Sequence, residues 1–526
     1  MLDRERREAF WSQLDREFDL VIIGGGITGA GILAEATRLG LRAALFEAAD
    51  FASGTSSRSS KLVHGGLRYL RNAQVKLTWE SVRERERLLK EGRGLVSPLP
   101  FLMANFRGER LPPWLFGIGL TIYDLMALKW NHAARTAQEL RSLCPPLTSP
   151  DLVGGYRYFD ARVDDARLVL RLVLEAIARE GVALNYARVV RLLTRRDGRV
   201  CGVAVRDENP SGQGRTREVR ARVVVNATGA WADEVRAQVG GRRRLRRLRG
   251  GHLVFPFERL PLTRAVTFLH PRDARPVFAV PWEGVTFFGT TDVDHREPLR
   301  SDVRISEAEA EYLLEALRFA FPDLSLSKRD VLSTYAGVRA VVDTGKADPS
   351  KESREFVLWR EAGLLTVSGG KLTTFRLMAH HALRAVRAAL PEHEVPRRSE
   401  RIFDPLPAEA TLSDLPPEHR LRLLGRYGRW AARLVEIASP DELEPIAPLP
   451  ALWAELRWAA HAEAVLHLDD LLLRRVRLGL TLPQGGLEHI ERIRALVQGE
   501  LGWDDDRWEQ EVRDYRERWQ RFYSPV

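Results

Sequence analysis

The sequence has very few cysteines: Cys144 and Cys201 are the only two among its 526 residues. Two thiols are too few for a disulfide scaffold or for a metal site built from several cysteines. Sparse cysteine is typical of proteins in a reducing compartment, so we expect an intracellular protein. The adjacent His380 and His381 lack a complementary spacing of carboxylates and histidines, so no metal site is expected either.

Long apolar runs are also missing. The longest, residues 114–130 (WLFGIGLTIYDLMALKW), is shorter than the roughly 20 residues of a spanning helix and is interrupted by Asp124. The first 19 residues mix acids and bases and lack the apolar core of a secretory signal. We therefore expect neither a membrane-spanning helix nor a cleaved signal.

Low-complexity tracts and internal repeats are absent, and neither sign of charge is scarce. The 81 basic residues exceed the 71 acidic ones by 10, and 44% of the residues are hydrophobic, which is typical of folded globular proteins. A chain this long is expected to form at least two compact units. A net charge of +10 suits phosphate-bearing ligands, nucleic acid or anionic lipid, and it does not choose among them.

The order of periodic segments predicts an α/β protein with a helical C-terminal part. Residues 19–47 indicate a strand, a glycine turn, a helix ending near Gly40 and a second strand, which together make a βαβ unit. Three strand-like pieces between 187 and 226 predict a meander that returns to the parallel sheet. Residues 252–292 predict an antiparallel sheet followed by a helix over 306–319. After Leu390, proline-punctuated helical segments predict a separate domain.

A nucleotide-binding fingerprint lies within the first βαβ unit. Gly24, Gly26 and Gly29 form G-x-G-x-x-G between the strand and the helix, and Glu47 ends the second strand. Such glycines let a pyrophosphate approach the N–H groups at a helix N-terminus, and the acid can accept hydrogen bonds from ribose hydroxyls. The unit predicts dinucleotide binding without choosing between NAD and FAD.

The segment after Glu47, DFASGTSSRSSKLVHGGLRYL, is dense in small hydroxyl residues and glycines. Together with VVNATGAWAD, GTTDVD, YAGVRAVV and SGGKLTTFR, in that order, it resembles the FAD-dependent glycerol-3-phosphate dehydrogenases of the aerobic, respiratory type. The resemblance covers about residues 19–376, and HLDDLLLRRVRLGL extends it. It implies FAD as the cofactor. It also implies a Rossmann-type FAD-binding domain with an antiparallel β substrate-binding subdomain, plus a C-terminal all-α domain.

The resemblance also implies domain boundaries. An oxidoreductase domain is expected over 18–390 and a C-terminal helical domain over 391–526. Within the first, FAD-binding parts are expected at about 18–75, 152–250 and 330–390, and substrate-side parts at about 76–151 and 251–329.

The resemblance assigns FAD contacts beyond Gly24, Gly26, Gly29 and Glu47. They are Thr55, Ser56, Ser57, Lys61, His64, Gly65, Gly66, Leu67, Ala227, Gly229, Trp231, Gly370, Lys371, Thr373 and Thr374. The last four stand where SGGKLTTFR opens a helix, and a helix N-terminus can stabilise negative charge at the N1 and C2 carbonyl end of a reduced flavin.

The resemblance also assigns a substrate site. Glycerol phosphate is expected to contact Arg68, Tyr69, Arg339, Arg354 and Lys371, and guanidinium forks with an ammonium suit a phosphate dianion. Oxidising a secondary alcohol also needs a neutral base. His252, in RGGHLVF, is the expected base. Two alternatives stay open: His64 as the base, or Arg339 as the catalytic residue that favours the alkoxide.

The expected reaction is oxidation of sn-glycerol 3-phosphate to dihydroxyacetone phosphate, with hydride transfer to flavin N5 and electron transfer to membrane quinone. One rival is a related oxidase that uses oxygen, and another is a non-enzymatic basic protein that binds nucleic acid; we expect no nucleic acid partner. The basic run 242–249 (RRRLRRLR) and the apolar run 114–130 predict peripheral contact with anionic lipid. We expect a cytoplasmic protein at the inner face of the cell membrane. Its oligomeric state stays open, with a homodimer as one alternative.

Overall fold

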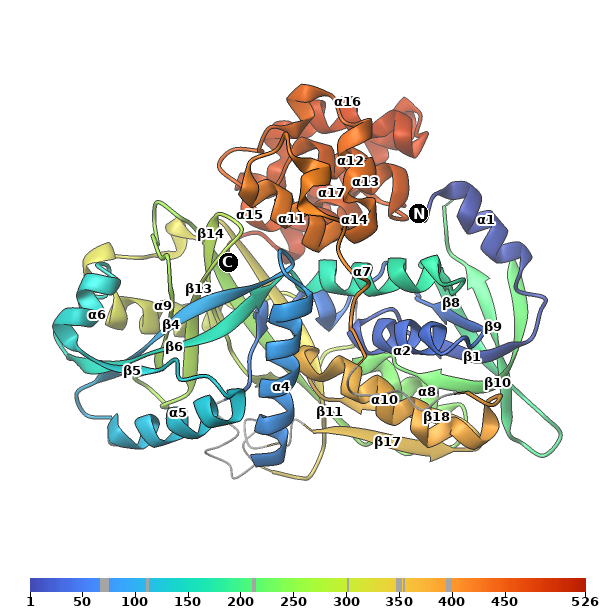
Figure 1. The fold of residues 1–526 in the computed structure, drawn as a ribbon, viewed down its shortest axis with the longest axis horizontal. Helices are drawn as coiled ribbons and strands as arrows, with labels where there is room; N and C mark the ends of the chain where they lie inside the picture. Colours follow the sequence, from blue (N-terminus) through green and yellow to red (C-terminus); the bar gives the residue numbers. More distant parts are fainter. Residues whose placement is uncertain are drawn as a thin grey trace.

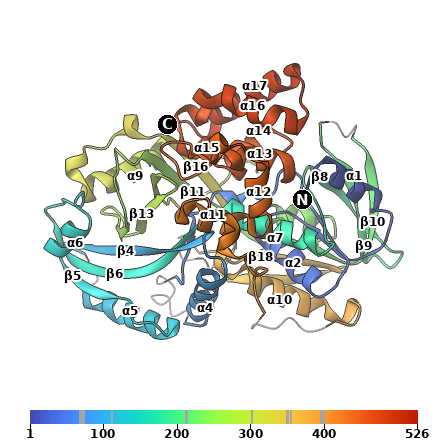
Figure 2. The same cartoon turned by 45° about the horizontal axis from the view of Figure 1, so that its top comes forward.

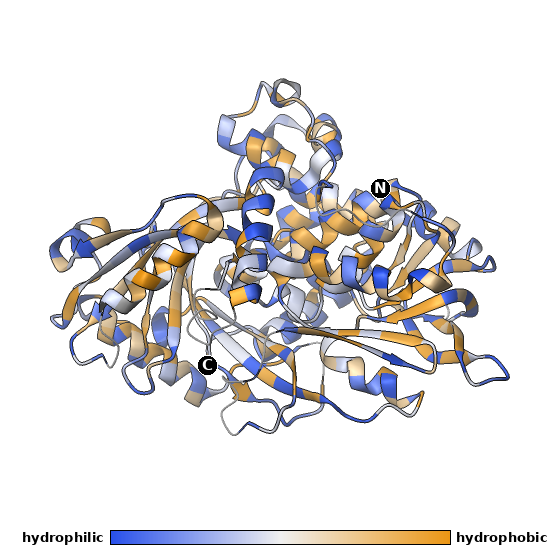
Figure 3. Ribbon diagram, turned by 60° about the horizontal axis from the view of Figure 1, so that its bottom comes forward, coloured by the Kyte–Doolittle hydropathy of each residue, from blue (hydrophilic) through white to orange (hydrophobic). Residues whose placement is uncertain are grey.

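The structure is a computed structural model that describes residues 1–66, 75–109, 113–210, 214–299, 302–346, 352, 355–393 and 400–526. Two sheets lie side by side, and a group of C-terminal helices covers the junction between them (Figure 1). Apolar residues run along the strands and the helices that pack on them (Figure 3).

The first sheet has eight strands among the described residues and carries the predicted βαβ unit. A parallel part orders β18 (Leu364–Gly369), β10 (Thr216–Asn226), β1 (Phe18–Ile23), β2 (Ala43–Phe46) and β7 (Val182–Leu184). Antiparallel additions are β17 (Phe356–Glu361) and the meander β8 (Ala187–Thr194) and β9 (Val200–Asp207). Packed against this sheet and one another are α2 (Ile27–Arg38), α7 (Asp165–Ala178) and α10 (Phe375–Val386). The βαβ unit and the meander were both predicted, and both are confirmed.

The second sheet has ten strands among the described residues. Its main path runs β15 (Val293–Asp294), β11 (Leu245–Pro256), β14 (Val285–Gly289), β13 (Pro276–Trp282), β12 (Ala265–Leu269), β4 (Val96–Phe106), β6 (Leu152–Val163) and β3 (Leu62–Val63). Off this path, β16 (Ser333–Val342) pairs with β11 and β5 (Ala133–Thr136) with β6. Around it lie α4 (Val75–Glu91), α5 (Pro113–Ala127), α6 (Ala137–Leu143) and α9 (Glu307–Ala320). All pairings are antiparallel except β12 with β4, and the helix expected at 306–319 is confirmed as α9.

The expected boundaries inside 18–390 stay predictions, and they do not coincide with the division into two sheets. The strands β6 and β16 fall within the ranges 152–250 and 330–390 that were expected to belong to the FAD-binding part, yet both pair within the second sheet. The two-residue strand β3 does the same from within 18–75. Each of the ranges 18–75, 152–250 and 330–390 therefore contributes strands to both sheets.

The C-terminal domain is helical, as predicted. It contains α11 (Pro417–Tyr427), α12 (Ala431–Ile437), α13 (Trp453–Ala462), α14 (Leu468–Asp470), α15 (Leu478–Thr481), α16 (Ile490–Leu501) and α17 (Asp505–Phe522), with a π-helical turn, η11, at Leu471–Arg475. Figure 2 shows this domain in front of both sheets, with α1 (Arg4–Ser12) to one side. One hydrophobic core joins the second sheet to these helices through residues such as Val254, Trp282, Leu471 and Leu478.

The two segments expected at a lipid surface, 114–130 and 242–249, take different forms in the structure: most of the first is a helix, and most of the second is a strand. Residues 113–127 form α5, and no helix of the described residues is long and apolar enough to cross a membrane. The basic run 242–249 is not a solvated loop, because most of it opens β11. Arg246 pairs with Asp294, Arg247 with Glu234 and Arg249 with Glu309. These ion pairs offset much of the charge expected to face lipid.

A buried ion network fastens the C-terminal domain to the loop that follows β2. Arg474 and Arg475 both donate to the Asp50 carboxylate, with Arg475 Nη2 at 2.8 Å from Oδ1, and all three side chains are almost fully buried. Nearby, Arg477 Nη2 donates to the carbonyl of Ser57 at 2.8 Å. Buried charges are costly unless paired, so the loop and the domain are stable only when joined.

Asp50→Asn should lower the free energy of unfolding by about 3 to 5 kcal/mol at pH 7, because it removes the carboxylate of the buried Arg475 and leaves Arg474 paired only with Asp469 and Asp470. Burial alone would raise the pKa of Asp50, but Arg475 and Arg474 outweigh it and lower the pKa from 3.8 to about 2. The stability supplied by the ionised carboxylate is therefore complete above about pH 4 and lost as the pH falls toward 2. Denaturant titrations at pH 7 and pH 3 should show a smaller acid loss in the variant.

The matched control is Glu436→Gln, which breaks the exposed Arg433–Glu436 pair and should change nothing measurable. Equal unfolding midpoints for wild type and Asp50→Asn at pH 7 would contradict the importance of the network.

Candidate functional site

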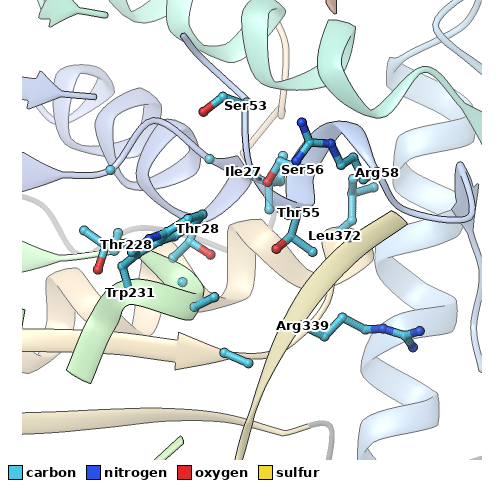
Figure 4. A pocket seen from close by; sticks show the side chains of 18 of the residues that line it. Ile27, Thr28, Ser53, Thr55, Ser56, Arg58, Thr228, Trp231, Arg339 and Leu372 are labelled. Carbon is cyan, nitrogen blue, oxygen red and sulfur yellow. Dashed lines mark hydrogen bonds between the residues drawn. The ribbon is translucent and has the colours of Figure 1, made fainter. Parts of the chain in front are cut away.

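One cavity of about 710 Å³ brings the predicted motifs together. Its walls come from the turn after β1, the loop after β2, the end of β10, β11, β16 and the segment that opens α10. In Figure 4, Thr228 and Trp231 lie toward one side of the cavity, and Arg339 on β16 lies away from them. The cavity therefore extends from the nucleotide fingerprint to the segments expected to hold the substrate.

The fingerprint glycines shape a tight turn between β1 and α2. Gly24 has φ +109°, and a Cβ there would lie 2.7 Å from the Ala227 carbonyl oxygen. A Cβ on Gly29 would lie 1.9 Å from the Gly24 carbonyl oxygen. Gly26 lines the cavity at the start of α2, whose Ile27 N–H donates to Ser56 Oγ at 2.9 Å. Larger side chains at Gly24 and Gly29 would break the turn that presents the helix N-terminus.

Glu47 lies at the end of β2, as predicted for a ribose-binding acid. Its Oε2 accepts from the Gly25 N–H at 2.6 Å and its Oε1 from the Ala49 N–H at 2.9 Å. Burial raises the pKa of Glu47, while these two hydrogen bonds oppose the rise. Each carboxylate oxygen retains a second lone pair that can accept from a hydroxyl in the cavity.

The hydroxyl-rich segment divides between the cavity and the protein interior. Thr55 and Ser56 line the cavity, whereas Ser57 and Lys61 do not. Lys61 is fully buried behind the loop, where Nζ donates to the Ser57 carbonyl at 3.0 Å and lies 3.1 Å from Asp165 Oδ1. Burial lowers the pKa of Lys61 to about 8. The FAD contacts expected of Ser57 and Lys61 stay predictions, and the Lys61 ammonium supports the loop by donating to the Ser57 carbonyl.

His64, His252, Arg339 and Lys371 line the cavity away from the fingerprint. Arg339 Nη2 donates to the Thr291 carbonyl at 3.1 Å, and Lys371 Nζ donates to Ser81 Oγ at 2.9 Å. The Gly369 and Gly370 pair has φ near +75°, so the turn before Lys371 requires glycine. This end of the cavity thus combines two cationic side chains with two imidazoles.

His252 is buried and held on three sides. Its ring stacks on Tyr335 at 4.5 Å between centroids, and Nε2 lies 2.9 Å from Ser60 Oγ. Burial lowers the pKa of His252 well below its usual value, and the charges of Lys61 and Arg339 lower it further. The imidazole is neutral at pH 7 and can accept a proton. Burial likewise lowers the pKa of His64 to about 4, so both histidines are neutral.

The cavity brings together most of the residues expected at the site. Those that line it are Gly24, Gly26, Glu47, Thr55, Ser56, His64, Ala227, Gly229, Trp231, His252, Arg339, Gly370, Lys371 and Thr373. Gly29, Gly65, Gly66 and Thr374 lie outside this lining. Leu67, Arg68, Tyr69 and Arg354 fall outside the described residues.

Among the lining residues that were not singled out from the sequence are Arg58, Ser60 and Thr228. All three stand inside quoted motifs, so the motifs could have pointed to them. Ser60 is the most informative, because its hydroxyl is the cavity-lining group beside His252.

The residues present fit FAD. The glycine turn leaves room for a pyrophosphate beside helix N–H groups, and the Trp231 ring packs against Gly54, where a Cβ would approach it to 3.2 Å. The Lys371 segment opens a helix at the wall of the same cavity. A ligand with a nucleotide at one end and a redox ring at the other matches this arrangement.

Two family models match the chain. One, described as FAD dependent oxidoreductase, matches residues 19–376, and the other, the C-terminal domain of alpha-glycerophosphate oxidase, matches 367–508. The chain is 35% identical to a glycerol-3-phosphate dehydrogenase of Mycobacterium leprae, over 98% of this chain and 91% of the relative. It is 37% identical to the aerobic glycerol-3-phosphate dehydrogenase of Bacillus subtilis, over 74% and 70% of the two chains.

A solved structure is also similar over nearly the whole chain. It is the glycerol-3-phosphate dehydrogenase of Bacillus halodurans in complex with FAD, with a TM-score of 0.78 and 28% identity. The match covers 98% of this chain and 97% of that one.

Proposed function

The chain belongs to the family of FAD-dependent glycerol-3-phosphate dehydrogenases, and on this premise we propose that it oxidises sn-glycerol 3-phosphate to dihydroxyacetone phosphate and passes the electrons to membrane quinone. The observation that carries the proposal is one cavity that is lined by the glycine turn and Glu47 and also by His252, Arg339 and Lys371. When bound, FAD supplies the hydride acceptor, its N5 atom.

The proton of the substrate hydroxyl goes to His252 in this proposal. The imidazole is unprotonated, as a general base must be, although the burial that lowers its pKa also makes it a weaker base. Its Nε2 lies 2.9 Å from Ser60 Oγ at the cavity wall. Ser60 can relay the proton or orient the alcohol. The alternative role of Arg339, stabilising the alkoxide while His252 only packs, predicts a much smaller effect of removing the imidazole.

Arg339 and Lys371 hold the substrate phosphate in this proposal. Both are cationic, both line the cavity, and they come from different elements, β16 and the segment before α10. Arg339 is partly exposed to the cavity and is oriented by the Thr291 carbonyl. A guanidinium and an ammonium approaching from two directions match the charge of a phosphate dianion. Arg68, Tyr69 and Arg354 complete this site in the proposal on the strength of the family resemblance alone.

Peripheral contact with lipid is also part of the proposal, and α5 supports it. Trp114, Ile118, Ile122 and Leu125 are exposed on one face of this helix, Leu125 by 70%. Exposed Val75 and Trp79 lie on α4, which packs beside α5 (Figure 1). An apolar stripe of this size is costly in water and suits insertion at the headgroup boundary, where quinone is within reach. Because Arg246, Arg247 and Arg249 of the basic run are ion-paired, apolar burial dominates the proposed contact.

Arg339→Ala should bind FAD normally and lower kcat/KM roughly 30- to 1,000-fold, about 2 to 4 kcal/mol, because a charge-assisted contact to the phosphate is lost. Arg339→Lys should recover only part of this loss. The measurement is anaerobic flavin bleaching during titration with sn-glycerol 3-phosphate, with glycerol and glycine as comparison substrates.

The control is Arg191→Ala on the exposed face of β8, which should retain full activity. Bleaching by glycine but not by glycerol phosphate would refute the proposed substrate. Reoxidation of the reduced protein by oxygen as fast as by a quinone analogue would favour the oxidase rival.

His252→Gln should keep FAD and slow flavin reduction at saturating substrate by roughly 100-fold or more, because glutamine keeps a polar group beside Ser60 but accepts no proton. Stopped-flow measurement of the flavin absorbance gives the rate. A wild-type rate would remove His252 from the proton path, and a slow His64→Gln would then make His64 the base.

Trp114→Gln, Ile118→Gln and Leu125→Gln together should abolish sedimentation with anionic vesicles while leaving flavin reduction unchanged, because the apolar face of α5 is lost and the cavity is untouched. Salt alone should release only a minor part of the wild-type protein. Val190→Gln with Phe257→Gln, two exposed apolar residues elsewhere, is the control and should sediment normally. Wild-type protein that stays in the supernatant at low salt would show that the lipid contact is wrong.

A further inference from the structure

Helix α5 reaches the cavity wall through one side chain on the face opposite its apolar stripe. Tyr123 is buried, and its hydroxyl oxygen accepts from the Gly65 N–H at 2.7 Å. The same hydroxyl donates to Asp160 Oδ1 on β6 at 2.6 Å. Arg85 on α4 donates to that carboxylate at 2.6 Å and places its guanidinium 4.8 Å from the centre of the Tyr123 ring. Three elements therefore meet at one backbone N–H.

Gly65 lies next to the cavity wall rather than in it. The preceding residue, His64, lines the cavity, and its carbonyl accepts from Thr373 Oγ1 at 3.4 Å. A Cβ at position 65 would lie 2.5 Å from Tyr123 Oη and 2.4 Å from Val82 Cγ2. Glycine at this position thus allows the tyrosine hydroxyl to approach the backbone.

The charges around Tyr123 fix the direction of each hydrogen bond. Burial raises the pKa of Tyr123 well above its usual value, so the phenol keeps its proton. The proton points to Asp160, whose carboxylate is paired with Arg85, and the phenol oxygen is left to accept from Gly65. In a buried chain of this kind each hydrogen bond polarises the next.

We infer that Tyr123 is a positioning residue that fixes the His64–Gly65 backbone against the flavin end of the cavity, with Asp160 and Arg85 orienting its hydroxyl. The inference rests on the proposed function for the reaction that is affected, but the effect on bound FAD is independent of the substrate. A side chain that only packed would stabilise the protein without influencing the flavin.

The test compares full-length Tyr123→Phe with wild type. FAD affinity is measured by reconstitution of the apoprotein, and the flavin absorbance spectrum and midpoint potential are measured on the holoprotein. We expect FAD binding to weaken roughly 2- to 10-fold, as for loss of one hydrogen bond, with a shifted spectrum and potential. Flavin reduction should slow by about 10-fold with little change in the half-saturating substrate concentration.

Tyr515→Phe is the matched control, because it removes a buried phenol that donates to the Gly485 carbonyl within the C-terminal domain. It should lower Tm about as much as Tyr123→Phe but leave FAD affinity, spectrum and potential at wild-type values. If Tyr123→Phe behaves like this control, the inference is wrong.

Asp160→Asn keeps the phenol but weakens its acceptor and removes the charge paired with Arg85, so it should shift the spectrum and FAD affinity in the same direction. If Tyr123→Phe does not fold, this variant decides: wild-type flavin properties in Asp160→Asn overturn the inference. Failure of sn-glycerol 3-phosphate to reduce wild-type flavin would refute the proposed function and leave these two readouts valid.

Discussion

Ion pairs buried beneath the loop that follows β2 hold this protein together. Asp50 is paired with Arg474 and Arg475, and Lys61 with Asp165, at sites almost without solvent. An unpaired charge at either site would cost several kcal/mol. Neither the loop after β2 nor the helical segment that carries Arg474 and Arg475 is therefore stable in its final form alone. The loop that lines the FAD cavity therefore owes its shape to the last quarter of the chain. In this sense the helical domain is a structural part of the cofactor site.

Local sequence patterns predicted the elements well and their partners less well. The βαβ unit, the meander and α9 were predictable because glycine turns and apolar periodicity act over a few residues. The pairing of β6 within the second sheet was not predictable from local pattern, because an alternating strand pairs equally well in either sheet and its neighbours β4 and β3 are distant in sequence. The basic run looked like a surface patch because its carboxylate partners are distant in sequence; Glu309, for example, is 60 residues from Arg249.

Sequence motifs identified the site residues, but they did not show which side chains face the cavity. In the segment from Thr55 to Lys61, Thr55, Ser56 and residues 58–60 line the cavity whereas Ser57 and Lys61 do not, and only the fold decides which residues face the cavity. The glycines in the motifs now have a packing explanation. A Cβ on Gly250 would lie 2.1 Å from the Arg339 guanidinium, and one on Gly289 would lie 2.4 Å from the His252 ring. The motifs RGGH, GTTD and YAGVR are thus parts of one packed unit.

The pairing of Asp50 with Arg475 also sets an order of events during biosynthesis. The two residues are 425 positions apart in the chain, so at roughly 5 to 20 residues per second the βαβ unit leaves the ribosome about 20 to 85 s before its counter-charge exists. During that interval the Asp50 carboxylate has neither Arg474 nor Arg475 to pair with, so it cannot be buried as in the finished protein. Stable capture of FAD is then a post-translational step, and a chain truncated before Arg474 would be made with an intact fingerprint and no finished site.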